Sequence, residues 1–373
     1  MLKVSAPGKL FLSGEWAVLE IGNPGIVTAV DKRVFVELDE SEKISLDLPE
    51  FNIANLEASF DGKNLSWSRQ ITDKEKSDLI FIKGAIETTL QYLGSYKNFK
   101  IKSYGGDTQM IIDGQKKKIG FGSSAAAVVA TVAGLLAFNG YDIKNRQVKG
   151  TVYKLATIAH FFAQGKVGSA FDVAASTYGG VFVYKRFDPV WLAEKLKSGE
   201  SVKRVVEEKW SDFEVEELFV PEDFTLLVGW TKESASSSAM VKQMDSFKTG
   251  NPKEYKRCYD NIANLVRELI PAWKKIEKEK ILKLLRKNED YLRELGQLSG
   301  VNIETPELKK LADIANSLGA AGKLSGAGGG DCGIAICFDN QTTEKVKAEW
   351  SKAGLCPIDT ELDKEGVRIE PNK

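Results

Sequence analysis

The sequence predicts a two-domain protein of the α+β class, and three observations support this prediction. A chain of 373 residues exceeds what one hydrophobic core usually supports. Residues 26–38 carry the alternating Val and Phe side chains that are typical of a β-strand. Residues 76–92 instead repeat apolar side chains at the spacing of an amphipathic helix. Both kinds of element therefore belong to the same chain.

The composition predicts a cytoplasmic enzyme or binding protein. Lys and Arg together number 52, as do Asp and Glu, so no basic excess indicates nucleic acid or an anionic membrane as a partner. Lys3, Pro7 and Lys9 interrupt the N-terminus before a signal-peptide core could form. The longest apolar run, residues 125–138, is shorter than the roughly 20 residues that span a bilayer.

Cysteine and histidine usage gives little support to a metal centre made of soft ligands. The four cysteines show neither Cys-x-x-Cys pairing nor zinc spacing, so we expect buried free thiols. The single histidine, His160, excludes a histidine-rich metal site. We expect it to be a helix residue rather than a catalyst.

The N-terminal part begins with strands. Residues 10–12 form the first, and the Gly-Asn-Pro-Gly turn at 22–25 leads into the strand at 26–38. Residues 39–75 are polar with short strand-like pieces, and the helix at 76–92 follows. Residues 110–112 then predict a strand that enters a hairpin at Asp-Gly.

The stretch at residues 118–127, KIGFGSSAAA, predicts an anion site. Its two glycines allow a sharp turn, and a helix over 124–138 that is apolar on all sides follows at once. The first N–H groups of a helix have no partner within it, so a glycine-rich turn leading into a helix offers donors to phosphate. Either Ser123 or Ser124 could also bind a phosphate-associated Mg²⁺. The alternative is a tight turn that only caps a buried helix.

A second helix is predicted over residues 145–164, followed by a Gly-Ser turn, Asp172 and a strand at 178–184. Asp172 is either a site residue or a helix N-cap. The charged segment 187–221 reads as a connection between domains. We expect the domains to be residues 1–190 and 191–373.

The C-terminal part contains a buried strand at 224–230 and a serine cluster at 231–239, which reads most simply as a loop. Helical patterns cover residues 252–270, 273–298 and a segment that opens at Thr305-Pro306. The segment 323–333 then holds four glycines within five positions, for which we expect a backbone reason such as positive φ or close approach to a ligand.

Three of these stretches together resemble one superfamily. They are SAPGKLFLSGEWAVL at 5–19, GFGSSAA at 120–126 and KLSGAGGGD at 323–331. In order and spacing they resemble the three motifs of the GHMP kinases, which include galactokinases, homoserine kinases, mevalonate kinases and phosphomevalonate kinases. GKVGSAFD at 165–172 and GWTKESASS at 229–237 are most similar to the phosphomevalonate kinase branch. Mevalonate kinases usually carry His where Trp16 stands and a Mg²⁺-binding glutamate near His160, so their metal ligands cannot be transferred.

The resemblance implies an N-terminal domain like ribosomal protein S5 domain 2, a C-terminal ferredoxin-like domain, and ATP with Mg²⁺ between them. It implies phosphomevalonate and ATP as the small-molecule substrates. The catalytic pair would be Lys9 and Asp172, with Ser124 as a metal ligand. The nucleotide would be bound by Lys118, Gly120, Gly122, Ser123, Ser124, Ala125, Gly328 and Gly329. The acceptor would be bound by Lys9, Gly14, Glu15, Ser169, Ser234, Ser236, Ser237 and Asp331.

Two rival functions stay open. One is a sister enzyme that phosphorylates mevalonate or another small molecule, and the other is a sensor of the same fold that binds ligand without catalysis. The presence of both Lys9 and Asp172 argues against a sensor.

Overall fold

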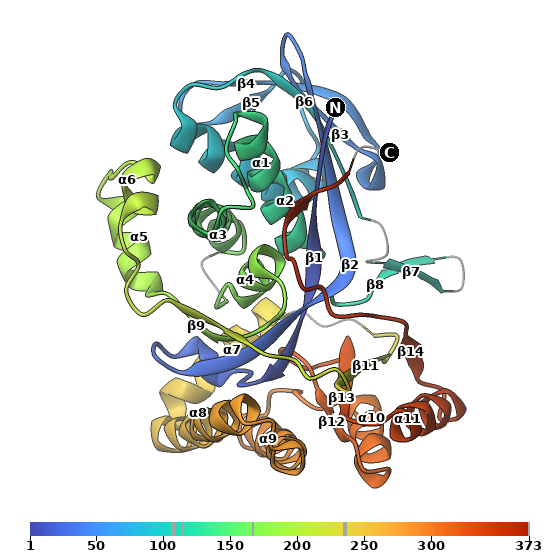
Figure 1. Ribbon diagram of the computed structural model, residues 1–373. Coiled ribbons are helices and arrows are strands. Elements are labelled where there is room, and N and C mark those ends of the chain that lie inside the picture. The colour runs from blue at the N-terminus through green and yellow to red at the C-terminus, as the bar shows by residue number, and fades with distance from the viewer. Residues whose placement is uncertain (106–108, 113–114, 166–167, 234–236, 372–373) are drawn as a thin grey trace.

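The computed structural model describes the backbone of residues 1–105, 109–112, 115–165, 168–233 and 237–371, and the side chains of 1–105, 119–165, 168–233 and 239–371. A large sheet with helices on one side forms the N-terminal part, and a smaller sheet with its own helices lies below it in Figure 1. The α+β class predicted from the sequence is confirmed.

Within the described residues, the larger sheet has nine strands, and the long strand β2 lies at its centre. The order runs β10-β9-β2-β6-β3-β4-β5, and β1 pairs with both β2 and β15. Neighbours are antiparallel except for β3 and β6. The strands are β1 (Leu2–Ser13), β2 (Pro24–Glu40), β3 (Ile44–Leu48), β4 (Ile53–Phe60), β5 (Leu65–Trp67), β6 (Phe99–Gly105), β9 (Val181–Lys185), β10 (Glu214–Leu218) and β15 (Arg368–Ile369).

The alternation of side chains along β1 places this strand between two hydrophobic cores. Phe11 faces the core beneath the N-terminal helices, whereas Leu10 and Leu12 face a second core shared with the smaller sheet. Successive side chains of a strand point to opposite faces, so one strand can join both parts of the molecule. Lys9, which precedes this segment, is thereby held near the junction of the two parts.

Four helices cover the outer face of the larger sheet: α1 (Asp73–Leu93), α2 (Ser123–Phe138), α3 (Arg146–Ala163) and α4 (Phe171–Tyr178) (Figure 1). Helix α1 begins earlier than predicted because Thr72 and Glu75 form a capping box. Helix α2 is buried over almost all of its length, as its uniformly apolar sequence predicts. The predicted hairpin strands are β7 (Gln109–Ile112) and β8 (Gln115–Lys118), which pair with each other, and the intervening Asp-Gly lies outside the described residues.

The interpretation of residues 187–221 as a connection is wrong. They form helices α5 (Pro189–Lys197) and α6 (Val202–Glu207) and strand β10, which pairs with β9. Asp188 and Ser201 cap the two helices, and Val205 and Trp210 are buried in the N-terminal core. The charged residues form the solvent-exposed face of these elements. Because they are so frequent, the few buried apolar residues do not form a recognisable pattern in the sequence.

The smaller sheet has the order β12-β13-β11-β14 and is antiparallel throughout the described residues. Its elements are β11 (Thr225–Trp230), α7 (Ser237–Gly250), α8 (Pro252–Lys274), α9 (Lys278–Ser299), α10 (Pro306–Ser317), β12 (Ala321–Leu324), β13 (Cys332–Cys337), α11 (Asn340–Lys352) and β14 (Cys356–Ile358). The predicted helix start at Trp273 is wrong, because Trp273 is buried in the last turn of α8 and the chain turns at 275–277. Part of the expected serine loop is helical in α7.

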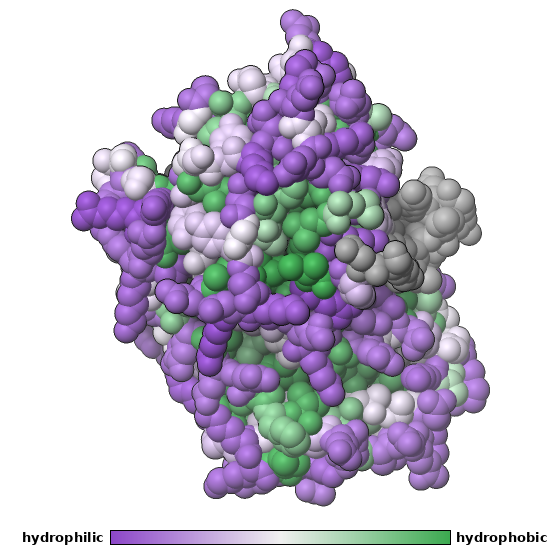
Figure 2. Space-filling view, turned by 45° about the horizontal axis from the view of Figure 1, so that its top comes forward, coloured by the Kyte–Doolittle hydropathy of each residue, from purple (hydrophilic) through white to green (hydrophobic). Residues whose placement is uncertain are grey.

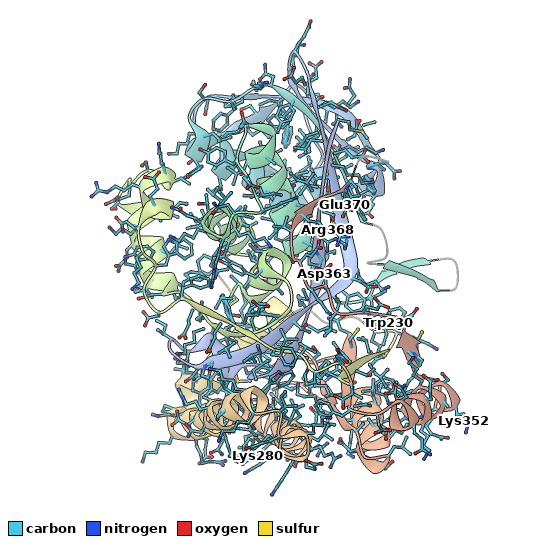
Figure 3. The ribbon with its side chains drawn as sticks, viewed as in Figure 1. Trp230, Lys280, Lys352, Asp363, Arg368 and Glu370 are labelled. Carbon is cyan, nitrogen blue, oxygen red and sulfur yellow. The ribbon has the colours of Figure 1, made fainter. Side chains whose placement is uncertain are left out.

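The C-terminal segment, residues 359–371, returns to the larger sheet. Strand β15 pairs with β1 at Val4 and Ser5, and the Asp363 and Val367 N–H groups donate to the carbonyls of Ala29 and Thr177. Figure 3 shows Asp363, Arg368 and Glu370 along this segment. The division at residues 190 and 191 stays a prediction, and both β10 and β15 belong to the sheet of the first part.

On the face shown in Figure 2 the surface is largely hydrophilic, with hydrophobic residues gathered near its middle. In the described part of the chain, no helix is both long enough and apolar enough to cross a membrane.

Candidate functional site

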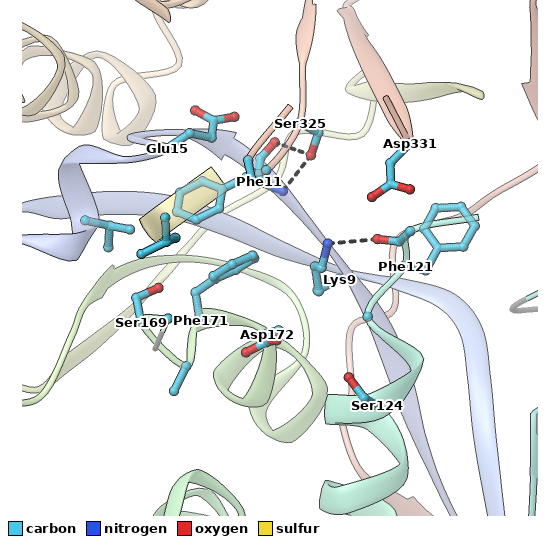
Figure 4. A pocket seen from close by; sticks show the side chains of 18 of the residues that line it. Lys9, Phe11, Glu15, Phe121, Ser124, Ser169, Phe171, Asp172, Ser325 and Asp331 are labelled. Carbon is cyan, nitrogen blue, oxygen red and sulfur yellow. Dashed lines mark hydrogen bonds between the residues drawn. The ribbon is translucent and has the colours of Figure 1, made fainter. Parts of the chain in front are cut away.

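A cavity of about 870 Å³ lies where the two parts of the molecule meet. All three sequence motifs and the segment around Asp172 contribute to its walls. Figure 4 shows Lys9 near the middle, with Ser169 and Phe171 on one side and Phe121 and Asp331 on the other. The predicted site residues that border it are Lys9, Glu15, Gly120, Gly122, Ser123, Ser124, Ser169, Asp172 and Asp331.

The glycine-rich loop is fixed to β1 by close backbone contacts. Gly120 and Gly122 have φ values of 91° and 76°, a region that favours glycine. A Cβ atom on Gly122 would lie 3.0 Å from Cε of Lys9, and one on Gly120 would lie 2.7 Å from Cγ of Asp331. The N–H of Lys9 donates to the carbonyl of Phe121 at 2.9 Å. A side chain at either position would strain the backbone and would displace Lys9 or Asp331.

Helix α2 begins at this loop without a side-chain cap. Its N-cap is Gly122, and neither Ser123 nor Ser124 caps it, because both lie within the first turn. The N-terminus of α2 thus faces the cavity with its first N–H groups available to an anion. Ala125 is fully buried behind the serines and does not border the cavity.

Lys9 and Asp172 reach the cavity from different elements. The Lys9 ammonium donates to the carbonyl of Gly120 at 2.8 Å and lies 5.5 Å from the ring centroid of Phe171. Asp172 lies in the first turn of α4, where its Oδ1 accepts from the N–H of Val173 at 2.9 Å. Among the described residues, no ion pair joins Lys9 to Asp172. Both charged groups are therefore open to a ligand placed between them.

Ser124 has a partner that the sequence did not reveal. Its Oγ lies 3.2 Å from Nε2 of His160, and the His160 ring stacks on Phe81 with 5.1 Å between centroids. His160 is 1% exposed, and burial lowers the pKa of its imidazole. His160 is a helix residue as expected, but it also contacts a cavity serine. The two residues are 36 positions apart in the sequence, so no local pattern indicates this contact.

Gly14 and Glu15, which were predicted to bind the acceptor, both make close contacts within the protein. The Glu15 carboxylate forms an ion pair with Lys323, and the two residues are 1% and 0% exposed. A Cβ atom on Gly14 would lie 2.7 Å from Cα of Gly25. Although Glu15 borders the cavity, its charge is engaged between the two parts of the molecule.

Gly328 and Gly329 do not border the cavity. A Cβ atom on Gly328 would lie 2.0 Å from the carbonyl oxygen of Ile303, and the N–H of Gly329 donates to the same oxygen at 2.9 Å. These glycines permit close backbone packing instead of an approach to a nucleotide. Ser325, Gly326 and Ala327 border the cavity in their place.

Several cavity residues were not predicted from the sequence, because only contacts in the folded protein bring them to the cavity. Ser325 Oγ bonds both the N–H and the carbonyl of Phe11, at 2.9 and 3.0 Å (Figure 4), and so ties the third motif to β1. The indole N–H of Trp16 donates to the carbonyl of Ala327 at 3.2 Å. Phe11 and Phe171 pack at 4.4 Å between centroids and form an aromatic wall.

Some predicted residues stay untested by the structure. Ser234 and Ser236 lie outside the described residues, and the side chains of Ser237 and Lys118 lie outside the described part as well. Lys232 is exposed and borders the cavity, next to Glu233. Asp331 borders it opposite Gly120, and its backbone carbonyl accepts from the N–H of Thr231 at 3.0 Å.

Behind Glu15 and Lys323 lies a second buried carboxyl group, Glu289 on α9. Its Oε2 accepts from the N–H of Leu324 at 3.0 Å, while Oε1 has no hydrogen-bond partner among the described residues. Burial raises the pKa of Glu289 to about 8, against the attraction of Lys323. The folded protein therefore keeps a proton on Glu289 that the unfolded chain releases at its ordinary pKa of 4.5.

We expect the stability of the wild-type protein to fall, relative to a Glu289→Gln variant, as the pH rises from about 4.5 to about 8. Over this window the folded state binds more protons at this site than the unfolded state does, so the stability that neutral Glu289 contributes is lost as the pH rises. Urea unfolding at pH 5.5 and 7.5 measures the difference between the two proteins. Glu294→Gln, a half-exposed position on the same helix, is the matched control. A difference that does not change with pH would contradict the protonated Glu289.

The comparisons with known proteins agree with the geometry. The family described as "GHMP kinases N terminal domain" matches residues 81–180, and the family "GHMP kinases C terminal" matches residues 269–355. The chain belongs to the GHMP kinases.

Among the relatives, the phosphomevalonate kinase of Streptomyces sp. is 31% identical over 97% of each chain. That of Saccharolobus solfataricus is 32% identical over 100% of each chain. The structure of Streptococcus pneumoniae phosphomevalonate kinase in complex with phosphomevalonate and AMPPNP has a TM-score of 0.82 and 28% identity, and covers 97% of this chain and 100% of its own. Within the superfamily, the chain belongs to the phosphomevalonate kinase family.

Proposed function

We propose that this protein transfers the γ-phosphoryl group of ATP to (R)-5-phosphomevalonate, which gives (R)-5-diphosphomevalonate and ADP in the mevalonate pathway of isoprenoid biosynthesis. The observation that carries the proposal is the arrangement of one cavity: the open N-terminus of α2 at one end, Lys9 and Asp172 in the middle, and the Ser169 loop beyond them. The full-length relatives and the neighbouring complex support the same substrates. We propose the cytoplasm as the location.

In the proposed reaction, an oxygen of the acceptor phosphate attacks the γ-phosphorus of ATP. A new P–O–P bond forms, the bond from the γ-phosphorus to the bridging oxygen breaks, and ADP leaves with that electron pair. The second pKa of a phosphate monoester is about 6, so at pH 7 the attacking oxygen is already largely anionic. The acceptor then needs alignment and neutralisation of charge more than it needs a base.

The residues around the cavity suit these tasks. Gly120, Gly122, Ser123 and Ser124 would place the nucleotide phosphates at the N-terminus of α2. Lys9, held by the loop carbonyl, would neutralise charge between donor and acceptor. Asp172 would orient Lys9 and the acceptor rather than remove a proton.

The oxygen atoms that border the cavity are suitable ligands for Mg²⁺. Mg²⁺ commonly uses one or two protein oxygens and completes its shell with phosphates and water. Ser124 Oγ and the Asp172 carboxylate both border the cavity and are hard oxygen donors. No cluster of three or more His, Cys, Asp or Glu side chains that could hold a metal occurs among the described residues, which suits an ion that arrives with the nucleotide. When bound, Mg²⁺ would withdraw charge from the ATP phosphates.

The acceptor preference is the direct test. With MgATP, the purified protein should release ADP at least about 100-fold faster with phosphomevalonate than with mevalonate, because a site built around a charged group rejects an analogue that lacks it. Homoserine and galactose serve as further acceptors in the same coupled assay. Equal or better turnover with mevalonate would contradict the acceptor assignment, and ligand binding without any turnover would favour a sensor.

A further inference from the structure

Arg186 is a buried cation beside the cavity that no step of the proposed reaction uses. It follows β9 and is 7% exposed. Its two terminal nitrogens donate to the carbonyls of Leu19 at 2.7 Å and Gly168 at 2.9 Å, while its Nε is buried and has no hydrogen-bond partner among the described residues. Leu19 and Gly168 both border the cavity although they lie far apart in the sequence. Arg186 therefore links two edges of the site.

The charge of Arg186 is not compensated by an ion pair within the described part of the chain. The nearby carboxylates are those of Glu20 and Asp188, and both are engaged elsewhere. Glu20 accepts from Lys248 at 2.5 Å and from the Tyr255 hydroxyl at 2.6 Å. Asp188 caps α5 through the N–H groups of Val190 and Trp191. The other deeply buried guanidinium, that of Arg33, forms an ion pair with Asp363.

A buried guanidinium without an anionic partner is costly for the fold, and arginine stays protonated even when burial lowers its pKa. Such a charge can be retained because a ligand supplies the missing negative charge. In Figure 4, Ser169, which follows Gly168 in the sequence, lies beyond Phe171 as seen from Lys9, on the side away from Ser124 in the first turn of α2. If ATP occupies the α2 end, the acceptor lies at this other end.

We propose that Arg186 is a positioning and specificity-determining residue for the acceptor. It holds the Leu19 and Gly168 edges apart at a fixed spacing, and its charge favours an acceptor that carries a phosphate group. This inference rests on the proposed function, because it assumes a phosphorylated acceptor at the Gly168 end of the cavity.

Three variants separate charge from geometry. Arg186→Lys keeps the charge, and Arg186→Gln keeps one hydrogen-bond donor group without the charge. Arg286→Gln is the matched control, because Arg286 also donates to two carbonyls, those of Ala320 and Gly319, on the side of the smaller sheet away from the cavity. Wild-type turnover with phosphomevalonate is measured first, and its absence would refute the proposed function before any variant is compared.

Arg186→Gln should raise the acceptor KM about 10- to 100-fold through the loss of one nearby charge, with the ATP KM changed by less than about twofold. The acceptor KM of Arg186→Lys should stay within about fivefold of the wild-type value. The acceptor KM of Arg286→Gln should equal the wild-type value. Calorimetric titration of phosphomevalonate into nucleotide-free protein should show the same order of Kd values. An equal rise of the acceptor KM in the Lys and Gln variants, or a parallel rise of the ATP KM, would show that Arg186 has only a structural role. Either result would overturn the proposal.

Thermal unfolding of each variant shows whether the variant is still folded. If Arg186→Gln does not fold, Arg186→Lys alone decides the question. A Lys variant with an acceptor KM near that of wild type supports the charge-based role. A Lys variant that folds but loses acceptor affinity by about 50-fold or more overturns it, because the charge is still present.

Discussion

Lys9→Met should lower kcat by about 10³-fold while the protein stays folded, which is the size of loss seen when one preorganised charge-stabilising donor is removed. The Lys9 ammonium has one described hydrogen bond, to the carbonyl of Gly120, and its methylene groups pack against Gly122. Methionine keeps much of that packing and removes the positive charge. The measurement is steady-state turnover with MgATP and phosphomevalonate, together with a thermal unfolding curve.

Lys3→Met is the matched control, since Lys3 lies on the same strand and pairs with Glu37 away from the cavity. Its turnover should equal that of wild type. Asp172→Asn should lose less kcat than Lys9→Met, because a dianionic acceptor needs no base. The opposite order would favour base catalysis and an alcohol as acceptor.

Asp363→Ala should destabilise the protein by about 3 to 5 kcal/mol, the usual cost of leaving a buried charge without its partner. Arg33 and Asp363 form an ion pair in which the side chains are 6% and 5% exposed. Arg33 also donates to the carbonyls of Ser5 at 3.0 Å and Gly366 at 2.7 Å, so it joins β1 to the C-terminal segment. Denaturant unfolding of wild type and variant gives the difference.

Two further variants show whether the burial of the pair causes the loss. Glu365→Ala removes an exposed carboxylate that pairs with Arg368, and should cost less than about 1 kcal/mol. The double variant Arg33→Met with Asp363→Ala should be more stable than the sum of the single changes predicts, because no unpaired charge remains. A loss below about 1 kcal/mol for Asp363→Ala would show that Glu370, 3.8 Å from Arg33, compensates the charge.

The sequence predicted best where local chemistry decides the outcome. The glycine-rich loop and α2 were recognisable because positive φ values and an apolar helix depend on neighbouring residues alone. The helix that opens at Thr305-Pro306 was found for the same reason, since its cap and its first-turn proline are adjacent in sequence. The superfamily and the acceptor class were predicted in a different way, from the resemblance of short motifs to those of known kinases.

The sequence predicted least where contacts are distant. Gly328 and Gly329 looked like nucleotide contacts, but the backbone of Ile303 leaves no space for a side chain at Gly328 and accepts a hydrogen bond from the N–H of Gly329. His160 and Arg186 reach the site through partners 36 and 167 residues away, and no spacing rule marks such contacts. Residues 187–221 were misread because a few buried anchors among many charges do not produce a visible period.

The burial of α2 has a consequence for how the site attracts phosphate. From Ala125 to Leu136 the helix is almost wholly surrounded by the hydrophobic core, so little water or salt can screen the aligned peptide dipoles that end at Gly122. This attraction arises from backbone groups that do not titrate. It should therefore stay constant across the physiological pH range.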